Sequence, residues 1–244
     1  MTTMSDKIPQ IVMNQGKKLR YAAIVGIVTA FLFVILSTIN MYIYPGSFHI
    51  AYNVFPYPHY SFIYNNLSDM GMLHTFTGES NYLSAALFAF TLTLTGTGFL
   101  IYVRYFPRLF DPNSKSYKNA RVGSILGIIS SAAFIAIGWT PWNILVIPHM
   151  IFVFIGFVFS VIFNIFFAVA ILRDKSYPNL FGMSLVFYAL VIVGYLFALI
   201  FGPEYGSLAG RVVESLGQKI VVYTQMLVLI INATGHLFLL RKKK

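Results

Sequence analysis

The chain has 244 residues, of which 58% are hydrophobic and only 10% are charged. So few charged side chains cannot cover the surface of a water-soluble domain of this length, which excludes a soluble protein. The formal net charge is +10, and there is no cysteine, which excludes disulfides, thiolate catalysis and cysteine-held iron–sulfur clusters.

Apolar runs recur along the chain, and several reach the ~20 residues that cross a ~30 Å hydrocarbon core. They lack the short alternating segments of a membrane β-barrel. The sequence therefore predicts an all-α fold, a single polytopic bundle of six transmembrane helices over residues 21–240. A cytoplasmic arm at 1–20 precedes it and a basic cytoplasmic tail at 241–244 follows it. We expect the spans at about 21–44, 81–103, 120–142, 148–172, 180–202 and 219–240.

The basic residues predict the orientation. With six spans both termini lie on one side, and fifteen of the 17 lysines and arginines fall on that side, the exceptions being Arg211 and Lys219. The positive-inside rule places such a side in the cytoplasm, so we expect a multi-pass cell-membrane protein with both termini cytoplasmic. The net charge is then a topology signal that argues against nucleic acid as a partner, and anionic membrane lipids supply the counter-charge.

The segment between the first two spans, residues 45–80, contains no lysine or arginine. It is rich in tyrosine and phenylalanine, and Pro56 and Pro58 interrupt it. Aromatic rings prefer the membrane–water interface, whereas prolines break a spanning helix. We therefore expect this segment to form an outer aromatic-rich cap on the bundle.

One dense polar run lies in this cap, residues 65–71, with the sequence NNLSDMG. Such side chains hydrogen-bond nearby backbone amides, so a structural turn is the first interpretation. In a turn, Asn replaces Asp69 at a cost of at most about 1 kcal/mol. The second interpretation makes Ser68 a nucleophile or donor, Asp69 an acid, base or ligand, and Asn65 and Asn66 binding residues. Asn66 also begins a glycosylation sequon, which we expect to stay unmodified because a glycan would block packing of the turn.

Three further motifs accompany this turn: Gly-Glu-Ser-Asn at residues 78–81, Gly-x-x-Pro at 138–141 and Pro-His at 148–149. With the Asn-x-x-Ser-Asp-x-Gly turn itself, they make the chain resemble the prokaryotic multipass membrane family catalogued as domain of unknown function 998. More remotely, the chain resembles the Frag/DRAM/Sfk group. The resemblance covers most of the chain. It implies a helical membrane fold and a functional face at the turn, and it names no reaction because that family has no assigned activity.

Histidines and carboxylates gather on the expected outer side, and these residue types suit a tetrahedral zinc site. The candidate ligands are His59, His74, His149 and Asp69, while His74 and Glu79 are also candidate binding residues. No pair has the i, i+4 spacing that places two ligands on one helix face. Ordinary interfacial histidines are thus the competing interpretation, and the sequence leaves metal and cofactor content open.

Polar side chains also lie inside predicted spans, Asn164 in the fourth and Gln225, Asn232 and His236 in the sixth. Asn232 and His236 are one turn apart on one helix face. Intramembrane polar groups usually face the bundle interior, where interhelical hydrogen bonds contribute about 0.6 kcal/mol each. A polar translocation path is the alternative, and it lacks an acidic or basic residue in the middle of any span.

Two functional hypotheses follow from these patterns. In the first, an integral membrane protein, or an accessory subunit of a membrane complex, binds a lipid or a partner protein through its outer face. In the second, a membrane-embedded hydrolase acts on a lipid-like substrate at the outer leaflet through Ser68, Asp69 and His149, with or without a metal. Convergence of these three side chains on one pocket would favour the enzyme.

Overall fold

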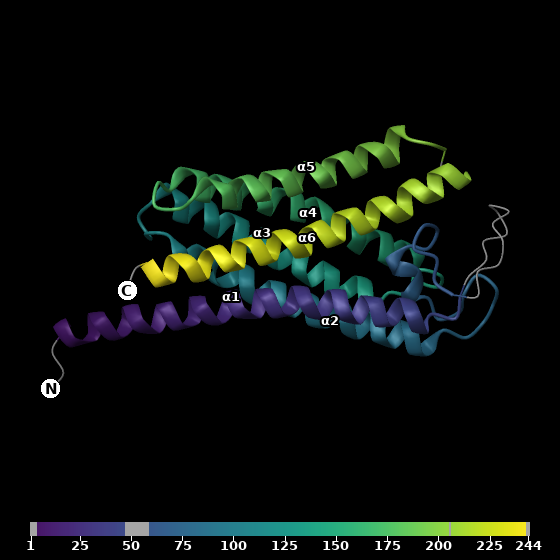
Figure 1. Ribbon diagram of the computed structural model, residues 1–244, viewed down its shortest axis with the longest axis horizontal. Helices are drawn as coiled ribbons and strands as arrows, with labels where there is room; N and C mark the ends of the chain where they lie inside the picture. The colour runs from purple at the N-terminus through teal and green to yellow at the C-terminus, as the bar shows by residue number, and fades with distance from the viewer. Residues whose placement is uncertain (1–3, 47–58, 205, 243–244) are drawn as a thin grey trace.

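The computed structural model describes residues 4–46, 59–204 and 206–242. Six of its helices are long and apolar enough to cross a membrane. Within the described residues, extended pairing is limited to an isolated bridge between His74 and Ser80. The predicted all-α bundle of six membrane helices is confirmed. Its helices (Figure 1) are α1 Met4–Ile43, η2 Leu67–Gly71, α2 Tyr82–Tyr105, η3 Phe106–Leu109, α3 Lys115–Gly138, α4 Val146–Arg173, α5 Asn179–Phe201 and α6 Leu208–Lys242.

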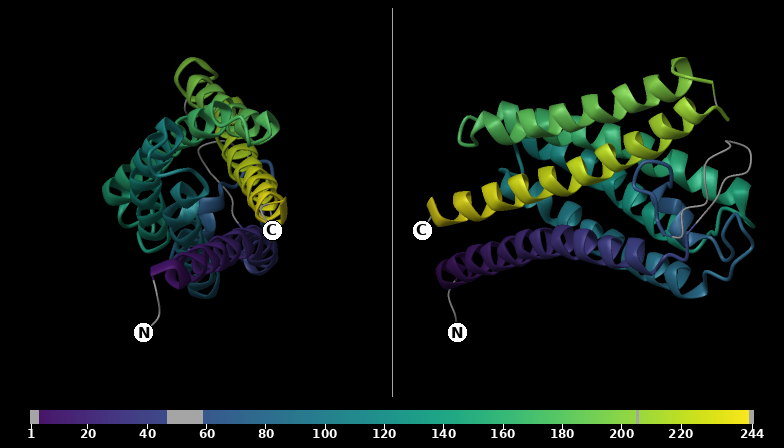
Figure 2. Two further views of the ribbon diagram at one scale, coloured as in Figure 1. Left: turned by 90° about the vertical axis from the view of Figure 1, so that its left-hand side faces the viewer. Right: turned by 45° about the vertical axis from the view of Figure 1, so that its right-hand side comes forward.

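The six long helices form a closed ring (Figure 2). Each packs against the helices before and after it in the chain, and α1 packs against α6. Short connections between α3, α4, α5 and α6 place these successive helices antiparallel and side by side. The start of α1 and the end of α6 therefore lie at one end of the ring, which we call the terminal end. The 3₁₀ helix η2 lies at the opposite end, which we call the plug end.

Two helices extend beyond the predicted spans. The expected N-terminal arm is helical from Met4 and continuous with α1. At the other end of the chain, α6 begins at Leu208, well before the predicted start at residue 219, so it contains Arg211 and Lys219. The assignment of Arg211 to the loop before the sixth span is wrong, because a charged side chain indicates a loop only where water is its partner. Here Arg211, like Lys219, is buried in the protein.

Small residues allow adjacent helices to approach closely. Gly98 in α2 faces α1 so closely that a β-carbon at this position would lie 1.9 Å from Thr29 Oγ1. Gly127 in α3 faces α2, and a β-carbon there would lie 3.1 Å from Val103 Cγ1. Lipid tails are as apolar as leucine, so helices in a membrane associate through van der Waals contact rather than the hydrophobic effect. Close backbone approach at these glycines supplies that contact.

One third of the predicted aromatic cap, residues 47–58, lies outside the described residues. A dense cluster of rings lies elsewhere, between α2 and α4 at the terminal end. Phe106 stacks on Phe167 with ring centroids 3.7 Å apart, and Tyr102 stacks on His236 with centroids 5.2 Å apart. All four rings are buried, so they fill the interior of the ring of helices at this end.

The contact between α1 and α2 gives a first testable prediction. Replacing Gly98 by Ala forces a methyl group against Thr29, so we expect the free energy of unfolding to fall by about 1–3 kcal/mol. Gly194→Ala in α5 is the matched control, because no atom lies within 4 Å of a β-carbon at that position. Thermal unfolding in detergent measures both, and equal stability of the two variants would contradict the packing of α1 on α2.

The membrane orientation is a second prediction. A reporter that is active only in the cytoplasm should be active when fused to either terminus or inserted near Lys115. The same reporter should be silent when inserted near Gly78, an exposed turn with nothing within 4 Å of a β-carbon at that glycine. An active reporter at Gly78 would contradict the predicted topology, because it would require the opposite orientation or a different number of spans.

Candidate functional site

A buried plug closes one end of the ring. It consists of residues 65–71, and η2 forms most of it. Although this segment is a loop between two spans, every residue of η2 is buried. Its turn is held locally, because Asp69 Oδ2 accepts hydrogen bonds from the Asn66 backbone N–H at 2.9 Å and from Asn65 Nδ2 at 3.0 Å. The predicted structural turn is therefore present, with Asp69 as its acceptor.

The plug is joined to α6 by a buried ion pair. Arg211 Nη2 lies 2.5 Å from the same Asp69 Oδ2, and the two side chains are 6% and 0% exposed. Arg211 also donates its Nε–H to the Tyr64 carbonyl oxygen at 2.7 Å. Breaking a buried pair of this kind leaves an uncompensated charge, which costs more than forming the pair gains. Asp69 is thus a positioning residue for the plug as well as a turn cap.

Other side chains on the same face of α6 also bind the plug. Glu214 Oε1 accepts from Asn66 Nδ2 at 2.7 Å, and Gln218 Oε1 accepts from the Leu67 N–H at 2.7 Å. The hydrogen bond of Asn66 Nδ2 occupies the nitrogen that a glycan would need, in a side chain that is 5% exposed. These contacts agree with the expectation that Asn66 stays unmodified.

Lys219 is a buried cation without a carboxylate partner in the described residues. Its Nζ donates to the Asn65 carbonyl oxygen and, at 2.9 Å, to Ser215 Oγ. The rings of Tyr60 and Phe62 lie 5.4 and 5.1 Å from the same ammonium nitrogen, within the range of cation–π contacts. Burial, and then the Asp69 carboxylate, raises the pKa of Tyr60, so this hydroxyl stays protonated and donates to the Asn65 carbonyl oxygen.

Sequence reasoning missed this face of α6. Its members recur at the spacing of one helix face, i, i+3, i+4, i+7 and i+8. Polar residues repeating in this way in an apolar helix indicate a partner inside the protein, and that signal was available. The residues of this face are Arg211, Glu214, Ser215, Gln218 and Lys219.

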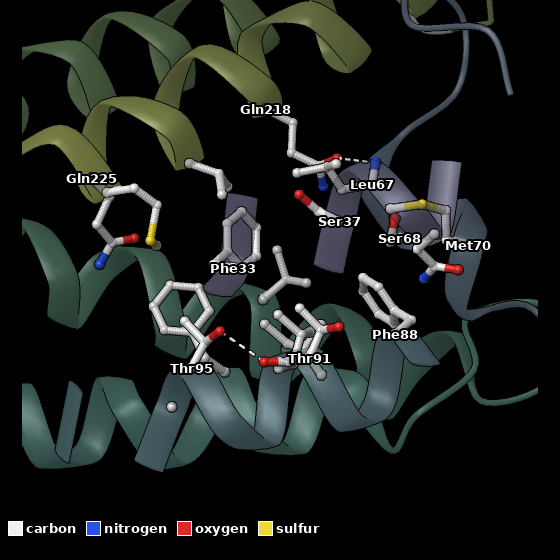
Figure 3. A pocket seen from close by; sticks show the side chains of 18 of the residues that line it. Phe33, Ser37, Leu67, Ser68, Met70, Phe88, Thr91, Thr95, Gln218 and Gln225 are labelled. Carbon is white, nitrogen blue, oxygen red and sulfur yellow. Dashed lines mark hydrogen bonds between the residues drawn. The ribbon is translucent and has the colours of Figure 1, made fainter. Parts of the chain in front are cut away.

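A cavity of about 70 Å³ lies directly beneath the plug, between η2 and the helices α1, α2, α3, α4 and α6. Figure 3 shows Ser68 and Met70 at one end of it and Gln225 at the other. Its walls are mainly aromatic and aliphatic, including Phe33 and Phe88. Ligand sites generally combine such apolar walls with a few polar groups that fix orientation.

Most polar side chains in the cavity wall already have hydrogen-bond partners. Thr91 Oγ1 and Thr95 Oγ1 each donate to a carbonyl oxygen of their own helix at 2.7 Å, so neither has a proton left to donate. Ser37 Oγ likewise donates to the Val34 carbonyl oxygen at 3.1 Å. These groups contribute little to recognition.

A smaller set keeps hydrogen-bonding capacity toward the cavity. The hydroxyl of Ser68, Nε2 of Gln218 and the amide of Gln225 make no hydrogen bond to another described residue. His149 Nδ1 lies 2.7 Å from the Thr140 carbonyl oxygen, which only accepts, so Nδ1 carries the proton and Nε2 keeps its lone pair. Among the described residues, no charged side chain lines the cavity.

The three residues of the predicted hydrolase are only partly brought together. Ser68 and His149 line the same cavity, whereas Asp69 lies outside it and binds Arg211. No hydrogen bond joins any two of the three in the described residues. Asp69 therefore does not orient His149, whose ring is fixed by the Thr140 carbonyl oxygen.

The candidate metal ligands remain apart. His59, His74 and Glu79 are exposed, and His74 Nε2 lies 3.3 Å from the Tyr82 hydroxyl. In the part of the chain that the structure describes, no three histidine or acidic side chains are grouped closely enough to hold a metal ion.

The predicted intramembrane polar residues do face the interior. Asn164 and Asn232 line a second cavity of about 20 Å³, and Gln225 lines both cavities. His236 lies beyond them at the terminal end, where its Nε2 is 3.3 Å from the Tyr102 hydroxyl. Interior packing is confirmed for all of them.

Comparison with models of known protein families, with curated proteins and with solved structures finds no match. The resemblance to the uncharacterised multipass family stays a prediction. The functional argument therefore depends on the geometry of the site.

The ion pair between plug and α6 gives a third prediction. Arg211→Met leaves the Asp69 carboxylate buried without its counter-charge, so we expect the free energy of unfolding to fall by about 3–5 kcal/mol. Asp69→Asn leaves the guanidinium with only the longer contact of its Nη1 to Glu214 Oε2, at 3.5 Å, among the carboxylates of the described residues, so the loss should exceed the ~1 kcal/mol expected for a simple turn cap. Thermal unfolding in detergent measures both.

Lys219→Met is the matched control, because like Arg211→Met it replaces a buried cation of α6 by methionine. It removes a buried cation together with its desolvation cost, and the Asn65 carbonyl oxygen keeps the hydroxyls of Tyr60 and Ser215 as donors. We expect a change within about 1 kcal/mol. Equal losses of unfolding free energy for Arg211→Met and Lys219→Met would show that the ion pair with Asp69 does not contribute specifically to stability.

Proposed function

We propose that this multi-pass membrane protein binds an uncharged amphiphilic lipid in the cavity beneath the plug. The observation that carries the proposal is an apolar intramembrane cavity whose free hydrogen-bonding groups are all neutral. Ser68 and Gln218 place such groups at the plug end, and the aromatic walls continue from there into the membrane.

The size of the cavity supports an apolar chain as occupant. A single water needs roughly 10–15 Å³ of such volume, and the cavity has about 70 Å³. Between the two ends at which Ser68 and Gln225 lie, the wall offers few partners to water, because the hydroxyls of Thr91 and Thr95 are already engaged in their own helix. A segment of hydrocarbon chain gains dispersion contacts with Phe33 and Phe88 instead.

The electrostatics of the site select a neutral headgroup. Recognition of phosphate normally uses arginine, lysine or a helix N-terminus. The two cations nearest the plug, Arg211 and Lys219, are buried and bind Asp69 and the Asn65 carbonyl oxygen. The remaining groups, a hydroxyl, a primary amide and an imidazole lone pair, suit a ligand hydroxyl, ester or amide.

The alternative function is hydrolysis of such a lipid at an ester bond. Its support is that Ser68 and His149 line one cavity, and catalytic hydrogen bonds often shorten only when substrate is bound. In this reaction water would split the ester into a fatty acid and an alcohol, with Ser68 as nucleophile and His149 as base. The absence of Asp69 from the cavity makes binding the better-supported function. A partner protein on the outer face is a third hypothesis that the same experiment addresses.

A matched pair of variants on α2 forms the fourth prediction. Thr95→Met fills the cavity, whereas Thr97→Met makes the same change at an exposed position of the same helix. Native mass spectrometry should detect co-purified neutral lipid on the wild type and on Thr97→Met. Occupancy of Thr95→Met should fall about tenfold, which corresponds to ~1.4 kcal/mol of binding free energy.

A matched pair of ligands tests the charge argument. A fluorescent monoacylglycerol should bind the delipidated protein, and the lysophosphatidate with the same chain should bind at least tenfold more weakly because burying its charge has no compensation. Equal binding of both, or no lipid on the wild type, would refute the proposal and leave the partner-protein hypothesis. Release of fatty acid that is lost in Ser68→Ala would instead establish the hydrolase.

A further inference from the structure

A second cavity lies deeper in the bundle, toward the terminal end. It has a volume of about 20 Å³ and is bounded by α2, α4, α5 and α6. Asn164, Tyr188, Gln225 and Asn232 contribute polar groups to its wall. Because Gln225 also lines the first cavity, the two cavities meet at this side chain.

Hydrogen-bonding capacity around the second cavity is incomplete. Asn232 Nδ2 donates to Ser184 Oγ at 2.9 Å and to the Val228 carbonyl oxygen at 3.0 Å, but its Oδ1 is buried and has no partner. The hydroxyl of Tyr188 is also buried, and it forms no hydrogen bond of standard geometry with the neighbouring Ser160 hydroxyl. The amide of Gln225, a side chain only 5% exposed, makes no hydrogen bond to another described residue.

Leaving such groups unpaired in a membrane interior is costly. Each buried donor or acceptor without a partner costs on the order of 1–3 kcal/mol. Native structures therefore satisfy these groups almost always, and an ordered water is the usual partner where protein is absent. Three unpaired groups around one small cavity point to a common partner.

We propose that the second cavity is a binding site for a single water molecule held by Gln225, Tyr188 and Asn232. Its volume exceeds the roughly 10–15 Å³ that one water needs, and three polar partners are the typical number. The wall offers both donors and acceptors and contains no carboxylate in the described residues. A cation would require acceptors alone, so a neutral molecule of the size of water fits best.

The site lies on a column of polar side chains along α6. Arg211, Gln218, Gln225 and Asn232 follow one another at intervals of seven residues, which is close to two helical turns. The column is about 30 Å long, comparable to the hydrocarbon thickness. The bound water therefore continues this column of polar groups from the plug into the terminal half of the bundle. There it supplies the hydrogen bonds that the side chains do not make with one another.

X-ray hydroxyl-radical footprinting tests the water site, because radicals form from waters bound beside a side chain. In wild-type protein in nanodiscs, we expect Tyr188 to be oxidised although it is fully buried. Tyr60, which lines neither cavity and whose hydroxyl already donates to the Asn65 carbonyl oxygen, is the reference. Asn232→Leu should reduce oxidation of Tyr188 several-fold and leave the rate of Tyr60 unchanged. Gln225→Leu should have the same effect if Asn232→Leu proves poorly folded by circular dichroism.

Three outcomes would overturn the proposal. The first is a wild-type protein in which Tyr188 is not oxidised. The second is an unchanged rate in both folded variants. The third is a rate that depends on exchanging sodium for choline, which would identify a cation site. Since the readout uses no lipid ligand, failure here is separable from failure of the lipid-binding proposal.

Discussion

The buried pair of Asp69 and Arg211 determines how the end of the bundle is built. Asp69 Oδ2 accepts from its own turn and from the guanidinium of α6, so a single carboxylate oxygen joins local turn geometry to a helix far away in the chain. Glu214 and Gln218 then bind the neighbouring residues of the plug. The position of Ser68 over the cavity follows from this anchoring, because Ser68 immediately precedes Asp69 in the plug.

The same interaction shapes the chemistry beneath it. Both cations at the plug end are held by plug oxygens, and Asp69 points its charge to Arg211. The cavity is therefore lined by neutral groups although a cluster of charges lies beside it. In a medium of low dielectric constant an unpaired charge would dominate recognition. Its containment in the plug is the reason that we propose an uncharged amphiphile as the ligand.

The closed ring of helices encloses the interior in which both cavities lie. Close approach at Gly98 and Gly127 draws α1, α2 and α3 together at their backbones, and two cavities remain between the helices. Stacked rings of Phe106 and Phe167 fill the terminal end. The interior is thus bounded by a polar plug at one end and an aromatic cluster at the other.

Much of the architecture could be predicted from the sequence, because it depends on local quantities. The length of the apolar runs predicts the spans, and the distribution of lysine and arginine predicts an orientation. The closely spaced Asn, Ser, Asp and Gly residues predict a turn at residues 65–71. The polar residues of the spans, Asn164 and Asn232 among them, face the interior as burial energetics require.

The tertiary structure alone decided which distant groups meet. The charge of Arg211 indicates a loop in the sequence, because a local pattern does not reveal that oxygens of the plug take the place of water. Ser68, Asp69 and His149 read as one catalytic unit, yet the ion pair with Arg211 leaves only Ser68 and His149 at the cavity. Free hydrogen-bonding capacity, which distinguishes Gln218 and Gln225 from Thr91 and Thr95, depends on partners that only the folded chain supplies.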